Sequence, residues 1–523
     1  MKSFPSTIYI LIILLFSNTA SSGIFGPKAA KFKEPLKDHE GIVLIQFVMN
    51  NRFQRGLSNW DYVIVKNLKT NKKKKLLPLY DNGRSASIIF SGILERGDYK
   101  LIEIEEVSEY AAVSISTETT TIPITERLGA FKISGKKITD LGTVIIHPDY
   151  MKNKKGDVER IMITSRTDEK SDLTQFLKEL RGDYYYSTIL DDVIGWNEKM
   201  ADWQLSMLEM IKRKGVPFKH YRLPDQSGKI IFHKLGKISH KVGSESWQST
   251  HTGYYSNFRG YARFKQGHLL AGEYGVLLYS EEFSGPWKKL DIIDPRYNII
   301  DIQVKDNKVI AKATYFQSKL SKCPDPKDCY GISTLEVDLV AGTYEKINKT
   351  QEEATFETMS FTDKAFQKQA NGMISKSRSM YKHSISVDNE KSWKKLKTKM
   401  AHKYSFIGYN NPRSIYIASD QMVYVVASPT KRFKGRKKIE HFVKPEVLQL
   451  FKGPIDKLHT KKSTYKVAEI NPYCSSLVPG LSVDDELYLS CVNGNLLVSK
   501  DEGVTWDLEF DNFLELLTSD EDK

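Results

Sequence analysis

Few residues in this sequence have the type and spacing that catalysis requires. The chain contains none of the short motifs of serine hydrolases, zinc peptidases, phosphate-binding loops or EF-hands, and its 11 histidines are scattered without metal-ligand spacing. One candidate is Arg222, in the segment Tyr221-Arg222-Leu223-Pro224. A guanidinium presents a planar fork of donors that can hold a carboxylate through two parallel hydrogen bonds. Arg222 is therefore a candidate carboxylate-binding residue, and we expect neither a metal nor another cofactor.

The four cysteines are spaced for disulfides. Cys323 and Cys329 flank a short loop with two prolines, which favours a local disulfide and leaves Cys474 and Cys491 to pair with each other. The alternative is that two or more of them are buried, reduced thiols. A zinc site is disfavoured because five and sixteen intervening residues do not match the usual ligand spacing. Disulfides form in oxidising compartments, so this pairing agrees with export.

The N-terminal residues have the layout of a secretory signal peptide. Lys2 precedes an apolar run over Ile8–Phe16, and small residues follow up to Ser22. The run is too short for a membrane-spanning helix, which takes about 20 apolar residues. We expect residues 1–22 to be a signal peptide, the mature chain to lack a transmembrane segment, and the protein to be periplasmic or extracellular. An uncleaved anchor is the alternative.

The elements that would position these residues are mostly strands. Between residues 39 and 150, short runs rich in β-branched and aromatic residues alternate with turn signals such as Asn82-Gly83, which predicts a β-sandwich. Two segments of this stretch, Leu94–Leu101 and Phe131–Gly142, resemble the turn and the late strand of small envelope sandwiches.

The stretch from 151 to 224 has a different apolar period. Apolar residues recur at helical spacing after Ser171 and again from Asn197 to Arg213. Gly182 and Gly215 follow these two runs and are typical of helix ends. We therefore expect a short helical connector over residues 151–224.

A repeated unit occupies the C-terminal part of the chain. Gly494–Trp506 and Gly275–Trp287 share the same spacing of glycine, serine and tryptophan, and Ser386–Trp393 keeps the spacing of serine, aspartate and tryptophan. The unit predicts a strand, a tight turn and a second strand. Asp501 can accept backbone N–H bonds across such a turn, and Gly503 can adopt a positive φ. The role of these residues is structural.

This unit resembles the Asp-box of BNR-type β-propellers, whose pattern is Ser-x-Asp-x-Gly-x-Thr-Trp. One copy matches every fixed position, and two copies are degenerate because each lacks the turn glycine and one has Glu282 for aspartate. The matching residues are Ser499, Asp501, Gly503, Thr505 and Trp506 in the full copy, Ser280, Glu282 and Trp287 in the second, and Ser386, Asp388 and Trp393 in the third. The segment Leu269–Ser280 also resembles the repeat of photosystem II assembly-factor-like propellers.

The resemblance implies a mostly-β chain whose C-terminal part, residues 225–512, is a β-propeller. The spacing of the tryptophans favours six blades of about 50 residues, with seven left open. Residues 513–523 would follow as an acidic tail.

Two functions follow from the resemblance. Asp-boxes lie in outer hairpins, so the first is an exported, non-catalytic protein whose propeller is a binding or assembly scaffold for an unknown protein or glycan. The alternative is a sialidase-like glycoside hydrolase, since those enzymes share Asp-box propellers and hold a substrate carboxylate with arginines. Tyr221–Pro224 is similar to their Phe-Arg-Ile-Pro motif, which makes Arg222 the candidate. The carboxylate that such enzymes place in the following segment is missing from Phe232–Lys241.

The net charge of +14 suggests a third kind of contact. Basic residues gather in Lys72–Lys75 and in Lys431–Lys438, both between expected strands. They are either solvated loops or a salt-sensitive attraction to anionic envelope polymers or lipid headgroups. Export disfavours nucleic acid as the partner.

Overall fold

The computed structural model describes most of the chain between residues 36 and 512. The described ranges are 36–49, 60–78, 87–111, 115–124, 128–152, 158–167, 195–223, 228–295, 297–305, 308–315, 332–347, 366–368, 373–379, 382–386, 392–397, 415–427, 448–454, 465–471, 474, 476–491 and 493–512. The predicted signal peptide and acidic tail lie outside them. Within these ranges no helix has both the length and the apolar character needed to cross a membrane.

The N-terminal strands form one nine-stranded sheet in the order β6-β5-β2-β3-β4-β1-β8-β9, with β7 paired to β5. Their bounds are β1 Glu40–Met49, β2 Trp60–Asn67, β3 Lys73–Pro78, β4 Ser87–Glu95, β5 Gly97–Ala111, β6 Ile115–Pro123, β7 Ala130–Ile133, β8 Ile138–Lys152 and β9 Val158–Arg166. Strand β3 links the two halves, because Lys73–Leu76 pair with β2 and Leu77–Pro78 pair with β4. Side chains from both halves, including Phe47, Phe90 and Phe131, share one core.

The expected boundaries of the helical connector need correction. Residues 151 and 152 still belong to β8, and β9 pairs with β8 as far as Arg166, so the N-terminal sheet extends beyond residue 150. One expected helix is present as α3, Asp202–Arg213, whereas the one after Ser171 lies outside the described residues.

In the described part of the chain, six four-stranded antiparallel sheets follow α3 in sequence order. The strands are β10 Pro217–Arg222, β11 Gly228–His233, β12 Lys237–Val242 and β13 Gln248–His251; β14 Phe258–Phe264, β15 Gly267–Gly272, β16 Leu277–Ser280 and β17 Lys288–Lys289; β18 Tyr297–Lys305, β19 Lys308–Tyr315, β20 Ile332–Asp338 and β21 Thr343–Ile347; β22 Phe366–Lys368, β23 Ile374–Ser379, β24 Lys382–Ser386 and β25 Lys394–Lys397; β26 Ile415–Ile417, β27 Met422–Ala427, β28 Leu448–Pro454 and β29 Tyr465–Ile470; β30 Ser476–Leu477, β31 Leu487–Ser490, β32 Leu496–Ser499 and β33 Asp507–Phe510.

These sheets are the blades of a β-propeller. Apolar clusters join the first sheet to the second, the second to the third, and the fifth to the sixth. A further cluster joins the last sheet back to the first, because Ile231 of β11 packs with Tyr488, Leu496 and Phe510. Radial repetition of small sheets leaves only short edges exposed. The protein therefore has a mostly-β propeller fold, as the sequence predicted.

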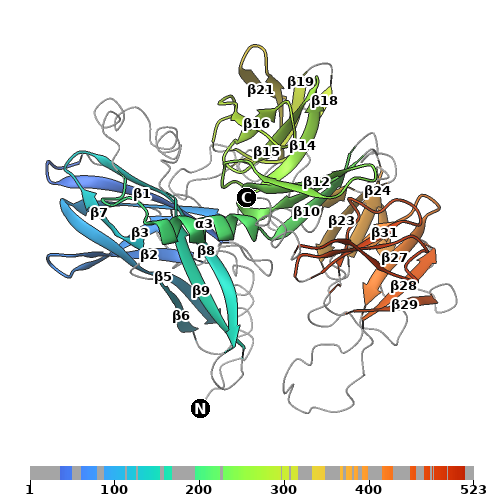
Figure 1. Cartoon of the computed structure of the whole chain (residues 1–523), viewed down its shortest axis with the longest axis horizontal. Coiled ribbons are helices and arrows are strands. Elements are labelled where there is room, and N and C mark those ends of the chain that lie inside the picture. The colour runs from blue at the N-terminus through green and yellow to red at the C-terminus, as the bar shows by residue number, and fades with distance from the viewer. Residues whose placement is uncertain are drawn as a thin grey trace, which may run out of the picture.

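Helix α3 lies between the N-terminal sheet and the propeller (Figure 1). Leu208 and Ile211 of the helix are buried in a core that also contains Val48 and Ile145 of the N-terminal sheet and Leu235 of the first blade. The Nζ of Lys237 donates to the carbonyl of Arg213 at 3.1 Å, and a cation at this end is favoured by the helix dipole. The helix is thus packed against both parts of the molecule.

Candidate functional site

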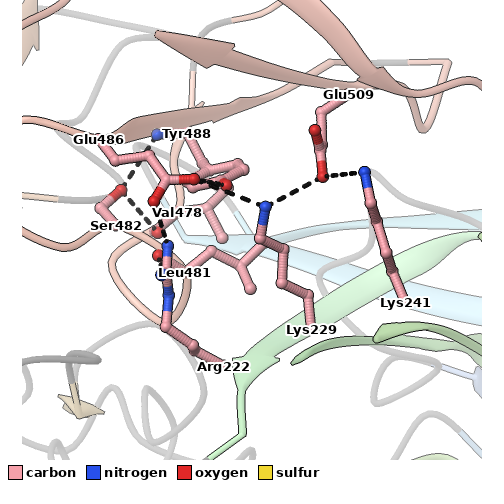
Figure 2. A network of polar contacts seen from close by, with 9 residues as sticks. All are labelled: Arg222, Lys229, Lys241, Val478, Leu481, Ser482, Glu486, Tyr488 and Glu509. Atoms are coloured by element: carbon pink, nitrogen blue, oxygen red, sulfur yellow. Dashed lines mark hydrogen bonds and ion pairs between the residues drawn. The ribbon is translucent and has the colours of Figure 1, made fainter. Parts of the chain in front are cut away.

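Arg222 ends β10 and reaches across to the last blade. Its Nε donates to the Leu481 carbonyl at 3.0 Å, and its Nη2 lies 2.8 Å from Oε2 of Glu486 (Figure 2). Its main-chain N–H donates to the Gly480 carbonyl at 2.9 Å. The side chain of Arg222 is only 11% exposed. The candidate carboxylate-binding residue therefore binds a carboxylate of its own chain.

A tyrosine and a glutamate join Arg222 at this point. Glu486 and Tyr488 are two residues apart, and Tyr488 lies on β31, where this spacing puts side chains on one face. The Tyr488 hydroxyl donates to Oε1 of Glu486. Ser482 accepts the Tyr488 N–H at 3.1 Å and donates to the Val478 carbonyl at 3.0 Å, which fixes the turn before β31. Sialidases use a tyrosine as nucleophile, so an arginine, a tyrosine and a glutamate in one place are residue types that a sialidase-like site would combine.

The protonation states of this group do not suit a nucleophile. Tyr488 is fully buried, and burial together with the Glu486 carboxylate raises the pKa of its hydroxyl far above the usual range. Burial also favours the neutral form of Glu486, but hydrogen bonds from Tyr488 and Arg222 outweigh it and lower the pKa of that carboxyl. A nucleophile needs access to substrate and an activated, deprotonated form. Tyr488 has neither.

Two lysines of the first blade complete the network. The Nζ of Lys229 lies 3.0 Å from Oε1 of Glu509 and 3.5 Å from Oε1 of Glu486, and Lys241 contacts the same Glu509 oxygen at 3.2 Å (Figure 2). The indole of Trp247 donates to the Glu509 carbonyl at 2.9 Å. Cations of the first blade thus face carboxylates of the last, so the cluster holds the ring closed.

The motifs in the sequence did not predict this network, although a weaker signal for it is present. Lys229 and Lys241 are directly opposite each other on β11 and β12. Like charges in such a pair repel, so the two ammonium groups require a shared counter-ion. Glu509 is that counter-ion, but it lies 280 residues from Lys229 in the sequence.

The residues of the full repeat copy form a tight hydrogen-bonded turn between β32 and β33. The Asp501 carboxylate accepts the Thr505 N–H at 2.9 Å, the Thr505 hydroxyl at 2.6 Å and the Ser499 hydroxyl at 2.7 Å. The Ser499 oxygen accepts the Gly503 N–H at 2.7 Å. Gly503 has φ 95°, and a Cβ there would collide with Leu450 of the fifth blade. The Trp506 indole donates to the Gly503 carbonyl at 3.0 Å, and its ring is partly buried.

The two degenerate copies lie in the corresponding turns of other blades, between β16 and β17 and between β24 and β25. Trp287 follows β16 and is 8% exposed, with Phe283 edge-on to its ring at 6.0 Å. Glu282 accepts the Ser284 hydroxyl at 3.2 Å, and Ser280 is buried. In the fourth blade Ser386 is buried and Trp393 is partly buried. Asp388 lies outside the described residues.

The cysteine prediction is confirmed in the half that the structure describes. Cys474, just before β30, and Cys491, just after β31, form a disulfide in the last blade. They are 6% and 3% exposed. Cys323 and Cys329 lie outside the described residues. No group of histidine, cysteine, aspartate or glutamate side chains in the described ranges is arranged to hold a metal ion.

The first basic run is compensated by carboxylates. Lys73 and Lys75 lie on β3 rather than in a loop, and their ammonium groups contact Glu103 at 3.0 Å and Glu105 at 2.6 Å. These pairs lower the local positive charge that an anionic surface would meet. The second run, residues 431–438, lies outside the described ranges.

Comparisons with known proteins find similar solved structures among the propellers. No protein-family model and no curated protein matches the chain. The structure titled "YCF48 bound to D1 peptide" is 10% identical and covers 57% of this chain and 82% of its own, with a TM-score of 0.32. YCF48 from Cyanidioschyzon merolae is 12% identical, with coverages of 57% and 85% and a TM-score of 0.30. The Cps50 (Swd1) β-propeller domain of Myceliophteria thermophila is 9% identical, with coverages of 56% and 85% and a TM-score of 0.26.

Proposed function

We propose that this chain is an exported, non-catalytic scaffold whose propeller binds a protein partner. The observation that carries the proposal is the use of Arg222, the candidate substrate-binding residue, to close the propeller ring through Glu486. Tyr488, which completes the set of catalytic residue types beside it, is buried and held in its protonated form by a raised pKa. A rigid ring with these polar side chains committed to internal contacts is suited to presenting a surface.

The disulfide supports the proposed location. Cys474–Cys491 would be reduced in most cytosols and persists in oxidising compartments. Fusion of residues 1–22 to a reporter enzyme that is active only after export tests this part of the proposal. Reporter activity outside the cytoplasm is expected, and its loss on Ile12→Arg would tie it to the apolar run. Activity that stays in the cytoplasm would refute export.

Turnover and binding separate the two candidate functions. The full chain is incubated with a fluorogenic sialoside between pH 4 and pH 8, and no turnover is expected. In parallel, random peptides displayed on phage are selected on the folded chain, with a chain unfolded in urea and reduced as the control. Enrichment of peptides with Kd below about 100 μM on the folded chain alone is expected, which is about 5.5 kcal/mol of binding. Sialoside turnover that Arg222→Ala abolishes, or a selection that enriches nothing, would overturn the scaffold proposal.

A further inference from the structure

A second polar cluster lies where the N-terminal sheet meets the propeller. Ser87, the first residue of β4, donates through its hydroxyl to Oε2 of Glu273 at 3.0 Å. The Tyr274 hydroxyl lies 3.1 Å from the same Ser87 oxygen and donates to the Ser87 carbonyl at 3.0 Å. Glu273 and Tyr274 belong to the turn between β15 and β16. Ser87 therefore joins the N-terminal sheet to the second blade.

The carboxylate of Glu273 is buried and its charge is compensated. It is fully inaccessible, and Nη2 of Arg259, which is 4% exposed, lies 3.5 Å from its Oε1. The Asn257 amide donates to Oε2 at 3.1 Å. A buried ion pair leaves no net charge for a further charged group to match. A group that binds beside this pair would have to be neutral.

Asn257 and Asn298 occupy equivalent positions at the start of two neighbouring inner strands. Asn257 directly precedes β14, and Asn298 is the second residue of β18. The turn that carries Glu273 reaches the start of both strands, because Glu273 accepts from Asn257 and the Gly275 N–H donates at 2.6 Å to the carbonyl of Tyr297, the residue before Asn298. The same two strands approach closely further along, where a Cβ on Gly260 would lie 3.0 Å from the Ile302 nitrogen. One turn thus contacts Asn257 and the residue next to Asn298.

Four polar side-chain atoms around this turn have no hydrogen-bond partner among the described residues. They are Ser256 Oγ, Asn257 Oδ1, and both Oδ1 and Nδ2 of Asn298. Ser256, Asn257 and Asn298 are 6%, 1% and 0% exposed. Buried polar groups are almost always paired, and each unpaired one weakens the fold. Several such atoms in one place indicate a site whose partner comes from outside the described chain.

We propose that this cluster of Ser87, Ser256, Asn257, Arg259, Glu273 and Asn298 binds the main chain of a partner peptide. The inference rests on the proposed scaffold function and identifies its site. A primary amide carries a donor and an acceptor side by side, as a peptide group does, and Asn298 has both atoms unpaired among the described residues. The compensated charge of Glu273 and Arg259 favours a neutral group such as a peptide bond over an acidic or basic side chain.

In the free protein Ser87 is bonded to the turn that carries Glu273, so the partner competes with Ser87. Its hydroxyl contacts Glu273 and Tyr274, and its carbonyl accepts the Tyr274 hydroxyl. A peptide that reaches Asn257 and Asn298 displaces these contacts. Loss of the Ser87 hydroxyl is therefore expected to strengthen peptide binding, whereas loss of the Asn298 amide weakens it.

The experiment measures the affinity of a selected peptide for the full chain and three variants by fluorescence polarisation. Asn298→Ala is expected to weaken binding about tenfold, the value of one lost hydrogen-bonding pair. Ser87→Ala is expected to strengthen it severalfold, and the control Asn493→Ala, an exposed asparagine of the last blade, should leave it unchanged. The melting temperature of each free variant, recorded in parallel, shows that it is folded.

The outcomes are distinguishable from those of the scaffold proposal. If the wild-type chain binds no selected peptide, the scaffold proposal itself fails. If peptides bind the wild type and Asn298→Ala equally well, the scaffold proposal stands and this site is wrong. In that case a lowered melting temperature of Asn298→Ala would assign the unpaired atoms to buried water. Equal or weaker binding by Ser87→Ala would refute the competition.

Discussion

Nη2 of Arg222, in the first blade, lies 2.8 Å from Oε2 of Glu486, in the last blade, although the two residues are 264 positions apart in the sequence. This contact joins the start of the propeller to its end. Because a propeller blade packs only against its neighbours, the ring depends on such contacts between the terminal blades. Arg222 thus helps to close the ring of blades.

Removal of the Glu486 carboxylate is expected to destabilise the propeller. Glu486→Gln leaves Arg222, which is 11% exposed, and Lys229, which is 18% exposed, without part of their counter-charge. The Glu486 side chain is 29% exposed, so breaking this pair should cost about 2 to 3 kcal/mol in the free energy of unfolding, less than for a fully buried pair. Urea denaturation measures it. The matched control is Glu469→Gln, since the Lys466–Glu469 pair is 41% and 59% exposed and should change stability by less than about 0.5 kcal/mol. Equal effects of the two substitutions would contradict the structural role of Glu486.

Trp287 and Trp506, two tryptophans of the repeat, are expected to differ in their contribution to stability. Trp287 is 8% exposed, so Trp287→Ala should cost about 3 to 5 kcal/mol, the usual range for a buried aromatic ring. Trp506 is only partly buried, and Trp506→Ala should cost about 2 kcal/mol through lost packing and the lost bond to the Gly503 carbonyl. Urea unfolding of both variants tests the order, and a larger loss for Trp506 would reverse it.

Local features of the fold could be predicted because neighbouring residues in the sequence produce them. The turn that contains Asp501 and Gly503 depends on hydrogen bonds and a positive φ within the short segment from Ser499 to Trp506. Helix α3 was predicted because its apolar residues recur at helical spacing, and the structure begins it at Asp202 instead of Asn197.

Contacts between distant residues could not be read in the same way. The residue type of Arg222 shows that it can bind a carboxylate. Nothing near it in the sequence indicates that this carboxylate is Glu486, because the pair forms only when the first and last blades meet. Similarly, Asn257 and Asn298 are ordinary polar residues until the packing of β14 against β18 places them at the starts of neighbouring strands. The position of Ser87 against Glu273 depends on the docking of a separate sheet.

The Asp501 carboxyl is expected to titrate far below an ordinary aspartate. The Thr505 hydroxyl and N–H and the Ser499 hydroxyl donate to it and lower its pKa to about 2. A lowered pKa means that the ionised form stabilises the fold above the unfolded pKa of 3.8, and this contribution is lost as the pH falls through about 2. Carbon-13 NMR of the carboxyl group measures the midpoint. Asp501→Asn should lower the melting temperature at pH 7 and have much less effect at pH 2, and a midpoint near 4 would contradict these bonds.

His251 is expected to make the protein less stable in mild acid. Burial, with the positive charge of Lys212 of α3, lowers the pKa of its imidazole to about 4, while the Leu235 main chain and Glu209 oppose this less strongly. Nδ1 of His251 accepts the Gly253 N–H at 3.0 Å, which requires that nitrogen to be unprotonated. Since the unfolded chain protonates near pH 6.5, it binds protons more tightly than the folded chain, and stability falls from pH 6.5 to about 4. The full loss is on the order of 3 kcal/mol.

Urea denaturation at pH 7.0, 5.5 and 4.5 measures the slope of stability against pH. His251→Asn keeps an acceptor in the place of Nδ1 but does not titrate in this range, so its slope should be shallower than that of the wild type. A residual slope is expected from His233, which is fully buried and whose pKa is lowered well below 6.5 by burial and by Lys237. The His233 ring bonds to the Gly215 carbonyl and the Ser239 hydroxyl. Protonation of His251 and of His233 would therefore both weaken the contact between α3 and the first blade. Identical slopes for the wild type and His251→Asn would show that His251 is protonated equally in the folded and unfolded chains.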